Sequence, residues 1–394
     1  MLPRIFIMLL RSAFTFGCLK QVWLQAPKLS FLRHMSKNSS EMDVLLERVA
    51  GKGVVTLNRP KALNALSLPM ARKIYQQMLE WEKDGSISMV IMKGAGGKAF
   101  CAGGDIVAIT KSKESGDSYA EDFFKEEYIL NHKIGTFKYP FVAVIDGITM
   151  GGGVGLSVHG MFRVATEKTL FAMPETAIGL FPDVGGSHFL PRLQGNLGMF
   201  LALTGYRLKG RDVCKAGVAT HFVEKNKVDS LEKSLLTLES PTQKKIAQVL
   251  NDFQNQSKTD ESKSFILEPH MEKINKLFGG NTVEEIIENL KEDGSEWALD
   301  QVNIISKMSP ISLKVTLNQL KEGAKKEFDA CFKMEYRLSQ HFVEDSDFHE
   351  GVRAMLVDKD HKPNWQPSNI SDVTDDKVNW YFTPLPENKE WKLP

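Results

Sequence analysis

A short apolar run that leads into three consecutive glycines most constrains how this chain can fold. Residues Phe141–Ile145 read Phe-Val-Ala-Val-Ile, which predicts a buried β-strand. Glycines follow at 151–153, and the apolar residues 154–158 behind them predict a buried helix. The first N–H groups of a helix have no partner inside it, and glycine lets a ligand approach the backbone. The stretch therefore predicts either a donor-rich site for an anion or oxyanion, or tight backbone packing between helix and strand.

A second stretch repeats this pattern earlier in the chain. Residues 89–92 read as a short strand, a glycine-rich turn follows, and a helix is predicted from about Asp105. Two strand–turn–helix units in one chain can direct two N–H groups at the same oxygen atom. Such a pair is an oxyanion hole built only from backbone.

The order of elements predicts the fold class. A strand at 54–57 is followed by an amphipathic helix at 69–81 and then by the strand at 89–92. Strand, helix, strand in this order implies a right-handed crossover and parallel pairing, hence an α/β fold. The polar residues 111–118 are expected to form a loop.

The composition changes in the last third of the chain, where charged helices dominate. Thr282-Val-Glu-Glu285 matches a capping box, and Ser309-Pro310 has the order favoured at a helix start. We therefore expect an α/β core over residues 40–240 and a helical region over residues 241–394 that packs on it.

An acid on an apolar helix face is a first candidate for the site. The helix predicted at 119–130 places Glu127 on the same face as Phe123 and Phe124. A carboxylate there is costly unless it is paired or faces a cavity. The alternative is that Glu127 lies at the edge of the apolar stripe and is solvated.

Two further acids, Glu175 and Asp183, are isolated in an apolar stretch punctuated by glycine and proline. Such acids are candidates for work in a pocket with a raised pKa. The alternative is structural, with Glu175 capping the following turn and Asp183 capping the next helix.

Composition narrows the class of protein. The net charge of +1 gives no global field for nucleic acid or anionic lipid, and no apolar run approaches the roughly 20 residues of a membrane span. The four cysteines form no CxxC pair, so neither a disulfide framework nor a zinc site is expected. Residues 1–38 are basic, and no acid precedes Glu41, which predicts a mitochondrial transit peptide. A secretory signal fits less well because its apolar core would be short.

Three motifs together carry a resemblance to a known family. Cys101-Ala-Gly-Gly-Asp105, the triple glycine at 151–153 and Pro174-Glu175 resemble the crotonase (enoyl-CoA hydratase/isomerase) superfamily over about residues 44–223. The resemblance implies a crotonase-like spiral of ββα turns that binds an acyl-CoA. It also implies that the N–H groups of Gly104 and Gly152 form the oxyanion hole.

One position departs from the hydratases of that family. They carry a glutamate two residues after the triple glycine, where this chain has Gly155. Glu175 is retained, and Asp183 lies eight residues further on. Together with Glu127 and the tail motif at 347–354, this set resembles the branch of the family that hydrolyses hydroxyacyl-CoA thioesters.

The resemblance implies a role for each acid in thioester hydrolysis. Glu175 would act as nucleophile or as general base, and Asp183 would orient Glu175 or the substrate hydroxyl. Glu127 and Gly152 would line the acyl pocket. No metal or redox cofactor is implied, the partner is an acyl-CoA, and neither nucleic acid nor membrane is expected. Self-association is left open.

Two rival functions remain from the sequence. One is another crotonase-type enzyme, a hydratase or isomerase, against which Gly155 argues. The other is a non-catalytic member of the fold that binds RNA or a protein, against which the near-neutral charge and retained acids argue.

Overall fold

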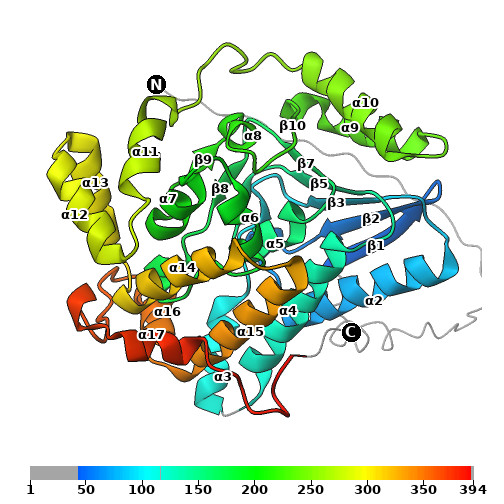
Figure 1. Cartoon of the computed structure of the whole chain (residues 1–394). Coiled ribbons are helices and arrows are strands. Elements are labelled where there is room, and N and C mark those ends of the chain that lie inside the picture. The colour runs from blue at the N-terminus through cyan, green and yellow to red at the C-terminus, as the bar shows by residue number, and fades with distance from the viewer. Residues whose placement is uncertain (1–42, 116, 392–394) are drawn as a thin grey trace, which may run out of the picture. The chain divides into compact units, whose positions relative to one another are not determined.

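Two β-sheets form the centre of the molecule, in a computed structural model that describes residues 43–115 and 117–391, with backbone alone at 111–115 (Figure 1). The first sheet has the order β1 (Val44–Val49), β2 (Lys52–Leu57), β3 (Val90–Gly94), β5 (Phe141–Ile145), β7 (Phe162–Ala165), β10 (His221–Phe222). The second has the order β4 (Ala99–Cys101), β6 (Ile148–Met150), β8 (Leu170–Ala172), β9 (Leu208–Lys209). The predicted transit peptide at 1–38 lies outside the described residues.

The chain adds strands to the two sheets in alternation. β3, β5 and β7 are parallel neighbours in the first sheet, while β4, β6 and β8 are parallel neighbours in the second. Each pass of the chain therefore adds one strand to each sheet before a helical turn follows. This is the ββα spiral, and the parallel pairing of β2 with β3 agrees with the crossover predicted from the sequence.

Helices cover the sheets. Those before residue 220 are α2 (Leu68–Asp84), α3 (Ile106–Ser115), α4 (Tyr119–Gly135), α5 (Gly152–Val158), α6 (Gly186–Phe189), α7 (Leu197–Thr204) and α8 (Asp212–Lys215), with short 3-10 turns that include η2 (Glu175–Ile178) and η3 (Leu190–Arg192). The later ones are α9 (Lys225–Thr237), α10 (Gln243–Asn255), α11 (Met271–Leu277), α12 (Val283–Asp293), α13 (Glu296–Ile305), α14 (Pro310–Gly323), α15 (Phe328–Glu344), α16 (Asp347–Val352) and α17 (Asp375–Tyr381).

Alternation along the parallel strands divides the buried residues between two cores. Val90 and Met92 of β3 join the larger core with α2 and α4, whereas Ile91 joins a smaller core under α9 and α10. Successive side chains of a strand point to opposite faces, so both faces of the sheet are buried. In Figure 1, α9 and α10 lie together at the top, away from α2.

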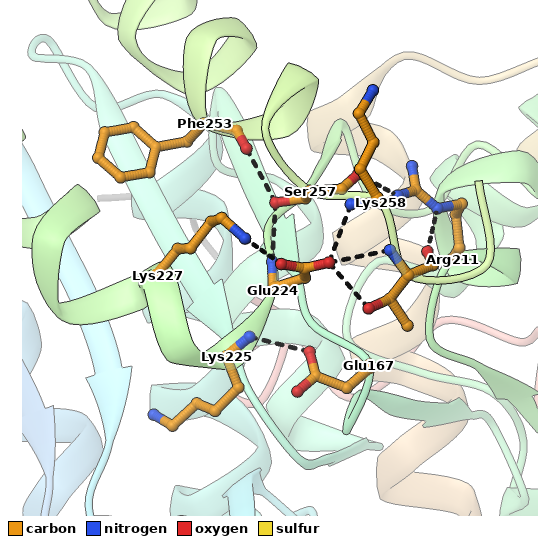
Figure 2. Close-up of polar contacts among 9 residues, drawn as sticks. Glu167, Arg211, Glu224, Lys225, Lys227, Phe253, Ser257 and Lys258 are labelled. Atoms are coloured by element: carbon orange, nitrogen blue, oxygen red, sulfur yellow. Dashed lines mark hydrogen bonds and ion pairs between the residues drawn. The ribbon is translucent and has the colours of Figure 1, made fainter.

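A polar cluster fixes the α9–α10 hairpin at its base (Figure 2). Glu224 Oε1 accepts from the backbone N–H groups of Lys258 and Thr259, each at 2.9 Å, and its other oxygen pairs with Lys227. Arg211 stacks on the ring of Phe222, 4.2 Å from its centroid. The Glu224 contacts join the chain that leaves α10 to the residue just before α9.

The loop predicted at 111–118 is wrong for its first five residues, because α3 continues to Ser115. Lysine, serine and glutamate have helix propensities close enough to those of apolar residues for a helix already begun to continue. The helical character predicted after residue 241 is confirmed by α10 to α17. Described residues on both sides of residue 240 fall in one compact unit, and the boundaries at 38 and 240 stay predictions.

Candidate active site

The two glycine turns lie side by side. Leu66 pairs with Gly104 in an isolated parallel β-bridge. The Leu66 N–H donates to Gly103 O at 2.9 Å, and Leu66 O accepts from the N–H of Asp105 at 2.8 Å. Gly104 N–H therefore points away from Leu66, because successive N–H groups of an extended chain alternate in direction. A Cβ added to Gly152 would lie 3.2 Å from Gly104 N, which places the two residues in contact. Gly152 is also the first residue of α5, where an N–H has no partner inside the helix.

Two of the predicted acids flank these turns. A Cβ on Gly152 would overlap Glu127 Oε1, and a Cβ on Gly151 would lie 3.1 Å from Glu175 Oε1. A side chain at position 152 would displace the Glu127 carboxyl and crowd the backbone of Gly103 and Gly104, which favours glycine there. The structure thus brings Gly104, Gly152, Glu127 and Glu175 together around one position.

All three predicted acids are buried, with exposed fractions of 2% for Glu127 and 4% each for Glu175 and Asp183. Burial is the largest cause that raises the pKa of each carboxyl, to about 7 for Asp183 and well above the usual range for Glu127 and Glu175. The Asp183 charge raises the pKa of both glutamates further. Glu127 Oε1 and Glu175 Oε2 have no hydrogen-bond partner within the described residues. The edge-of-stripe alternative for Glu127 is therefore wrong.

Tyr128 distinguishes Asp183 from the two glutamates. Its Oη donates to Asp183 Oδ2 at 2.8 Å, and this hydrogen bond favours the ionised form of Asp183. The capping alternatives fail, because the N-cap residues of η2 and α6 are Pro174 and Gly185, and neither element has a side-chain cap. We therefore interpret Asp183 as the acid of the cluster that most readily carries a negative charge.

The loop that carries Asp183 is held by Glu335 of α15. The Glu335 carboxyl accepts from the N–H of Gly185 at 2.7 Å, and from the N–H and hydroxyl of Ser187 at 2.8 and 2.5 Å. Val184 has φ of 51°, a left-handed conformation that is costly for a β-branched residue. The anchoring by Glu335 explains how the loop keeps that conformation.

Sequence reasoning missed Glu335, although a signal was present. It follows Phe332 by three residues on a face that also buries Leu338 and Phe342, which is the same pattern that drew attention to Glu127. Glu335 is the single acid in a long apolar stripe, and this pattern could have been recognised from the sequence.

The tail motif at 347–354 supports the turn that carries Glu175. Ser309 donates its hydroxyl to Asp347 Oδ2 at 2.6 Å and its N–H to Thr176 O at 3.1 Å. A Cβ on Gly179, at the end of η2, would overlap Asp347 O. The first turn of α16 and the N-cap of α14 thus clamp η2 from two sides. The motif contributes to the position of Glu175.

Gly155 faces a filled space. A Cβ there would lie 2.6 Å from Asn131 Oδ1 and 2.6 Å from Val184 Cβ. Asn131 is fully buried, one helical turn beyond Glu127 on α4, and neither its Oδ1 nor its Nδ2 has a hydrogen-bond partner among the described residues. A glutamate at position 155 does not fit this arrangement.

Over residues 43–115 and 117–391, histidine, cysteine and acidic side chains form no cluster of three that would suit a metal ion. No helix in the same residues is long and apolar enough to cross a membrane.

Comparison with known proteins places the chain in a family. The profile of the enoyl-CoA hydratase/isomerase family matches residues 52–382, so the chain belongs to this family. A solved carnitinyl-CoA dehydratase from Mycobacterium thermoresistibile superposes with a TM-score of 0.82 at 36% identity, over 89% of this chain and 98% of that one. An enoyl-CoA hydratase from Rhodobacter sphaeroides superposes with a TM-score of 0.78 at 34% identity, over 87% and 98%.

More similar relatives carry a different name. The mitochondrial 3-hydroxyisobutyryl-CoA hydrolase of Rattus norvegicus is 59% identical over 351 residues, which cover 89% of this chain and 91% of that protein. The Homo sapiens protein of the same name is 58% identical over 357 residues, or 91% and 92%. The crotonase-type fold predicted from the motifs is confirmed.

Proposed function

We propose that this chain hydrolyses the thioester of 3-hydroxyisobutyryl-CoA to the free hydroxy acid and CoA in mitochondria, as a step of valine breakdown. The relatives named for this reaction support the substrate, and one observation in the site supports the reaction type. Gly155 leaves no room for the second carboxylate that water addition to a double bond uses in this family. Thioester cleavage needs only one carboxylate as nucleophile or base beside two backbone N–H groups, and Glu175 can supply it.

The thioester carbonyl would lie between the N–H groups of Gly104 and Gly152. Its oxygen gains negative charge as a nucleophile adds to the carbonyl carbon, and the two donors stabilise that charge. Loss of one such donor typically costs about 2.7–4 kcal/mol of barrier. The leaving thiolate needs no strong general acid, because a thiol has a pKa of about 8.5.

Glu175 supplies the remaining chemistry in one of two ways. As nucleophile, its carboxylate attacks the carbonyl carbon, CoA leaves as thiolate, and water then hydrolyses the mixed anhydride. As general base, it takes a proton from the water that attacks directly. Either role needs ionised Glu175, whose pKa is raised by burial and by Asp183. Activity is therefore expected to rise with pH as Glu175 loses its proton.

Asp183 and Glu127 complete the acyl pocket. Asp183, supported by the Tyr128 hydroxyl, orients Glu175 or accepts from the substrate hydroxyl. Glu127, whose Oε1 has no partner among the described residues, receives a hydrogen bond from that hydroxyl or donates to it. 3-Hydroxypropionyl-CoA is also expected to react, because one missing methyl group changes discrimination by only about 1–3 kcal/mol.

Replacement of Glu175 tests this function. Glu175→Gln should lose most thiol release from 3-hydroxyisobutyryl-CoA while it still binds the CoA ester. Glu126→Gln, at a partly exposed residue of α4 that pairs with Arg72, should keep both. Near-normal hydrolysis by Glu175→Gln would exclude both roles. A single turnover in ¹⁸O-labelled water separates them, because only the anhydride route places label in Glu175.

An assay of crotonyl-CoA hydration distinguishes the rival activity. Faster water addition than thiol release would favour a hydratase. Salt-dependent RNA binding without thiol release would favour the non-catalytic alternative.

A further inference from the structure

A cavity lies at the C-terminal end of α5, away from the acid cluster. Its volume is about 450 Å³, within the range of small-molecule sites, and it lies at the C-terminal ends of α4 and α5. Arg163, Arg192, His159 and His188 contribute polar side chains, and Leu193 and Phe328 are among the apolar residues of its wall. None of these residues belongs to the acid cluster around Glu175.

Two arginines in this cavity carry charges that no acid of the described residues pairs with. Arg163 donates Nε to Val218 O and Nη1 to Gly160 O, each at 3.0 Å. Burial lowers the pKa of Arg163, and the neighbour that acts on its charge is the Cys214 thiol, which is neutral at pH 7 because its own pKa is about 12. Neutral carbonyls and a neutral thiol leave the guanidinium charge uncompensated.

Arg192 is in the same situation. Its Nη1 donates to His188 O at 2.6 Å and its Nη2 to Lys326 O at 3.0 Å. Across the described part of the chain, neither Arg163 nor Arg192 forms an ion pair with an acid. Arg163 Nη2 and Arg192 Nε make no hydrogen bond to a described residue and remain available as donors.

The two histidines do not supply the missing negative charge. His159 Nε2 donates to Val184 O at 2.7 Å, and burial lowers its pKa to about 3, so the ring is neutral. Burial and Arg192 lower the pKa of His188, and Glu327 opposes them. An anion in the cavity would face two guanidinium groups and two imidazoles, with the Glu327 carboxylate near His188.

We propose that this cavity binds a small organic carboxylate with an apolar body. The carboxylate would lie between Arg163 and Arg192, whose guanidinium groups match its geometry, and the body would pack on Leu193 and Phe328. The ligand would lie next to His159, which is hydrogen-bonded to the residue after Asp183. The proposal concerns binding alone, so its failure leaves the proposed hydrolase function untouched.

Benzoate is a suitable probe, because it combines one carboxylate with a compact apolar body. Isothermal titration should give saturable binding to the full chain, and inorganic phosphate should bind at least tenfold more weakly. Arg163→Met and Arg192→Met should each weaken benzoate at least tenfold, since each removes charge-assisted hydrogen bonds. Arg207→Met, at an exposed arginine elsewhere on the surface, should leave the affinity unchanged.

An NMR titration of the ¹³C-labelled histidine rings locates the probe without any substitution at the arginines. Benzoate should shift the His188 signal, assigned with His188→Gln, and raise the pKa of His188, because a bound anion offsets Arg192. Absence of saturable benzoate binding, an unmoved His188 signal, or phosphate binding as tight as benzoate would overturn the proposal. Unchanged affinity in both folded arginine variants would overturn it too.

Discussion

Glu335 offers a sharp test of how burial and hydrogen bonding compete in this molecule. Three donors on Gly185 and Ser187 converge on its carboxyl group and favour the ionised form. Burial acts against them and is the larger effect, raising the pKa of Glu335 to about 8. The perturbation is Glu335→Gln, because glutamine keeps the size and shape of the glutamate side chain and does not titrate.

The magnitude follows from linkage between protonation and folding. In the unfolded chain a glutamate loses its proton at about pH 4.3, whereas folded Glu335 keeps it until about pH 8. Between these values the folded state binds one more proton, so the free energy of unfolding falls as pH rises. The wild type should lose about 1.4 kcal/mol per pH unit relative to Glu335→Gln. From pH 5 to pH 7 the difference is roughly 3 kcal/mol.

Urea unfolding at pH 5, 6 and 7 measures this difference. The other buried acids are present in both proteins, so their titrations largely cancel in the comparison. Glu288→Gln, an exposed glutamate on α12, should show a pH-independent difference from the wild type. If the Glu335→Gln difference is equally flat, the three donors keep Glu335 ionised throughout, and the reasoning from burial is refuted.

Three further substitutions test the site. Tyr128→Phe keeps the ring and removes the donor to Asp183, so the pKa of Asp183 should rise by about 1–2 units. Because the Asp183 charge raises the pKa of Glu175, the acid limb of kcat/KM should move to lower pH, and an unmoved limb would mean that Asp183 does not act on Glu175. Gly155→Glu should destabilise the fold by about 1–3 kcal/mol in urea unfolding without giving crotonyl-CoA hydration, and a stable, hydrating variant would contradict the packing argument. Asn131→Leu removes two unpaired buried polar atoms and should leave stability equal or higher by about 1 kcal/mol, so a clear loss in urea unfolding would mean that Asn131 is paired.

The order of elements was readable because the strands of the core are short, apolar and interrupted by glycine. β5 has the bounds expected from its run of apolar residues, and the helix behind the triple glycine begins within two residues of the predicted position. The helix α3 was cut short in the prediction because polarity alone was taken to mark a loop. The antiparallel edge strand β1 has exposed residues at alternate and final positions, so its hydrophobic signal is weak.

The acids of the site were readable for a different reason. Glu127, Glu175 and Asp183 interrupt apolar stretches, and such interruptions are costly unless the acid has work to do or a partner. Their mutual proximity came from the motifs and the family resemblance, because nothing in the spacing of Glu127 and Asp183 places them at one point. The Tyr128 donor and the unpaired Asn131 amide depend on the packing of α4 against α5 and on the loop at Asp183. That packing is a tertiary feature that no local pattern encodes.

The departures from ordinary folding rules collect around one loop. Val184 adopts a left-handed conformation, Glu335 is a buried acid, and Asp183 has a raised pKa, each unfavourable by itself. Ordinary cores avoid all three, and such conflicts persist where the surrounding structure over-determines them. Here the conflicts are linked, because Glu335 holds the N–H groups that follow Val184 and thereby fixes where Asp183 points. We therefore interpret the loop at Asp183 and Val184 as a segment that holds the Asp183 carboxyl beside Glu175, and not as one that stabilises the fold.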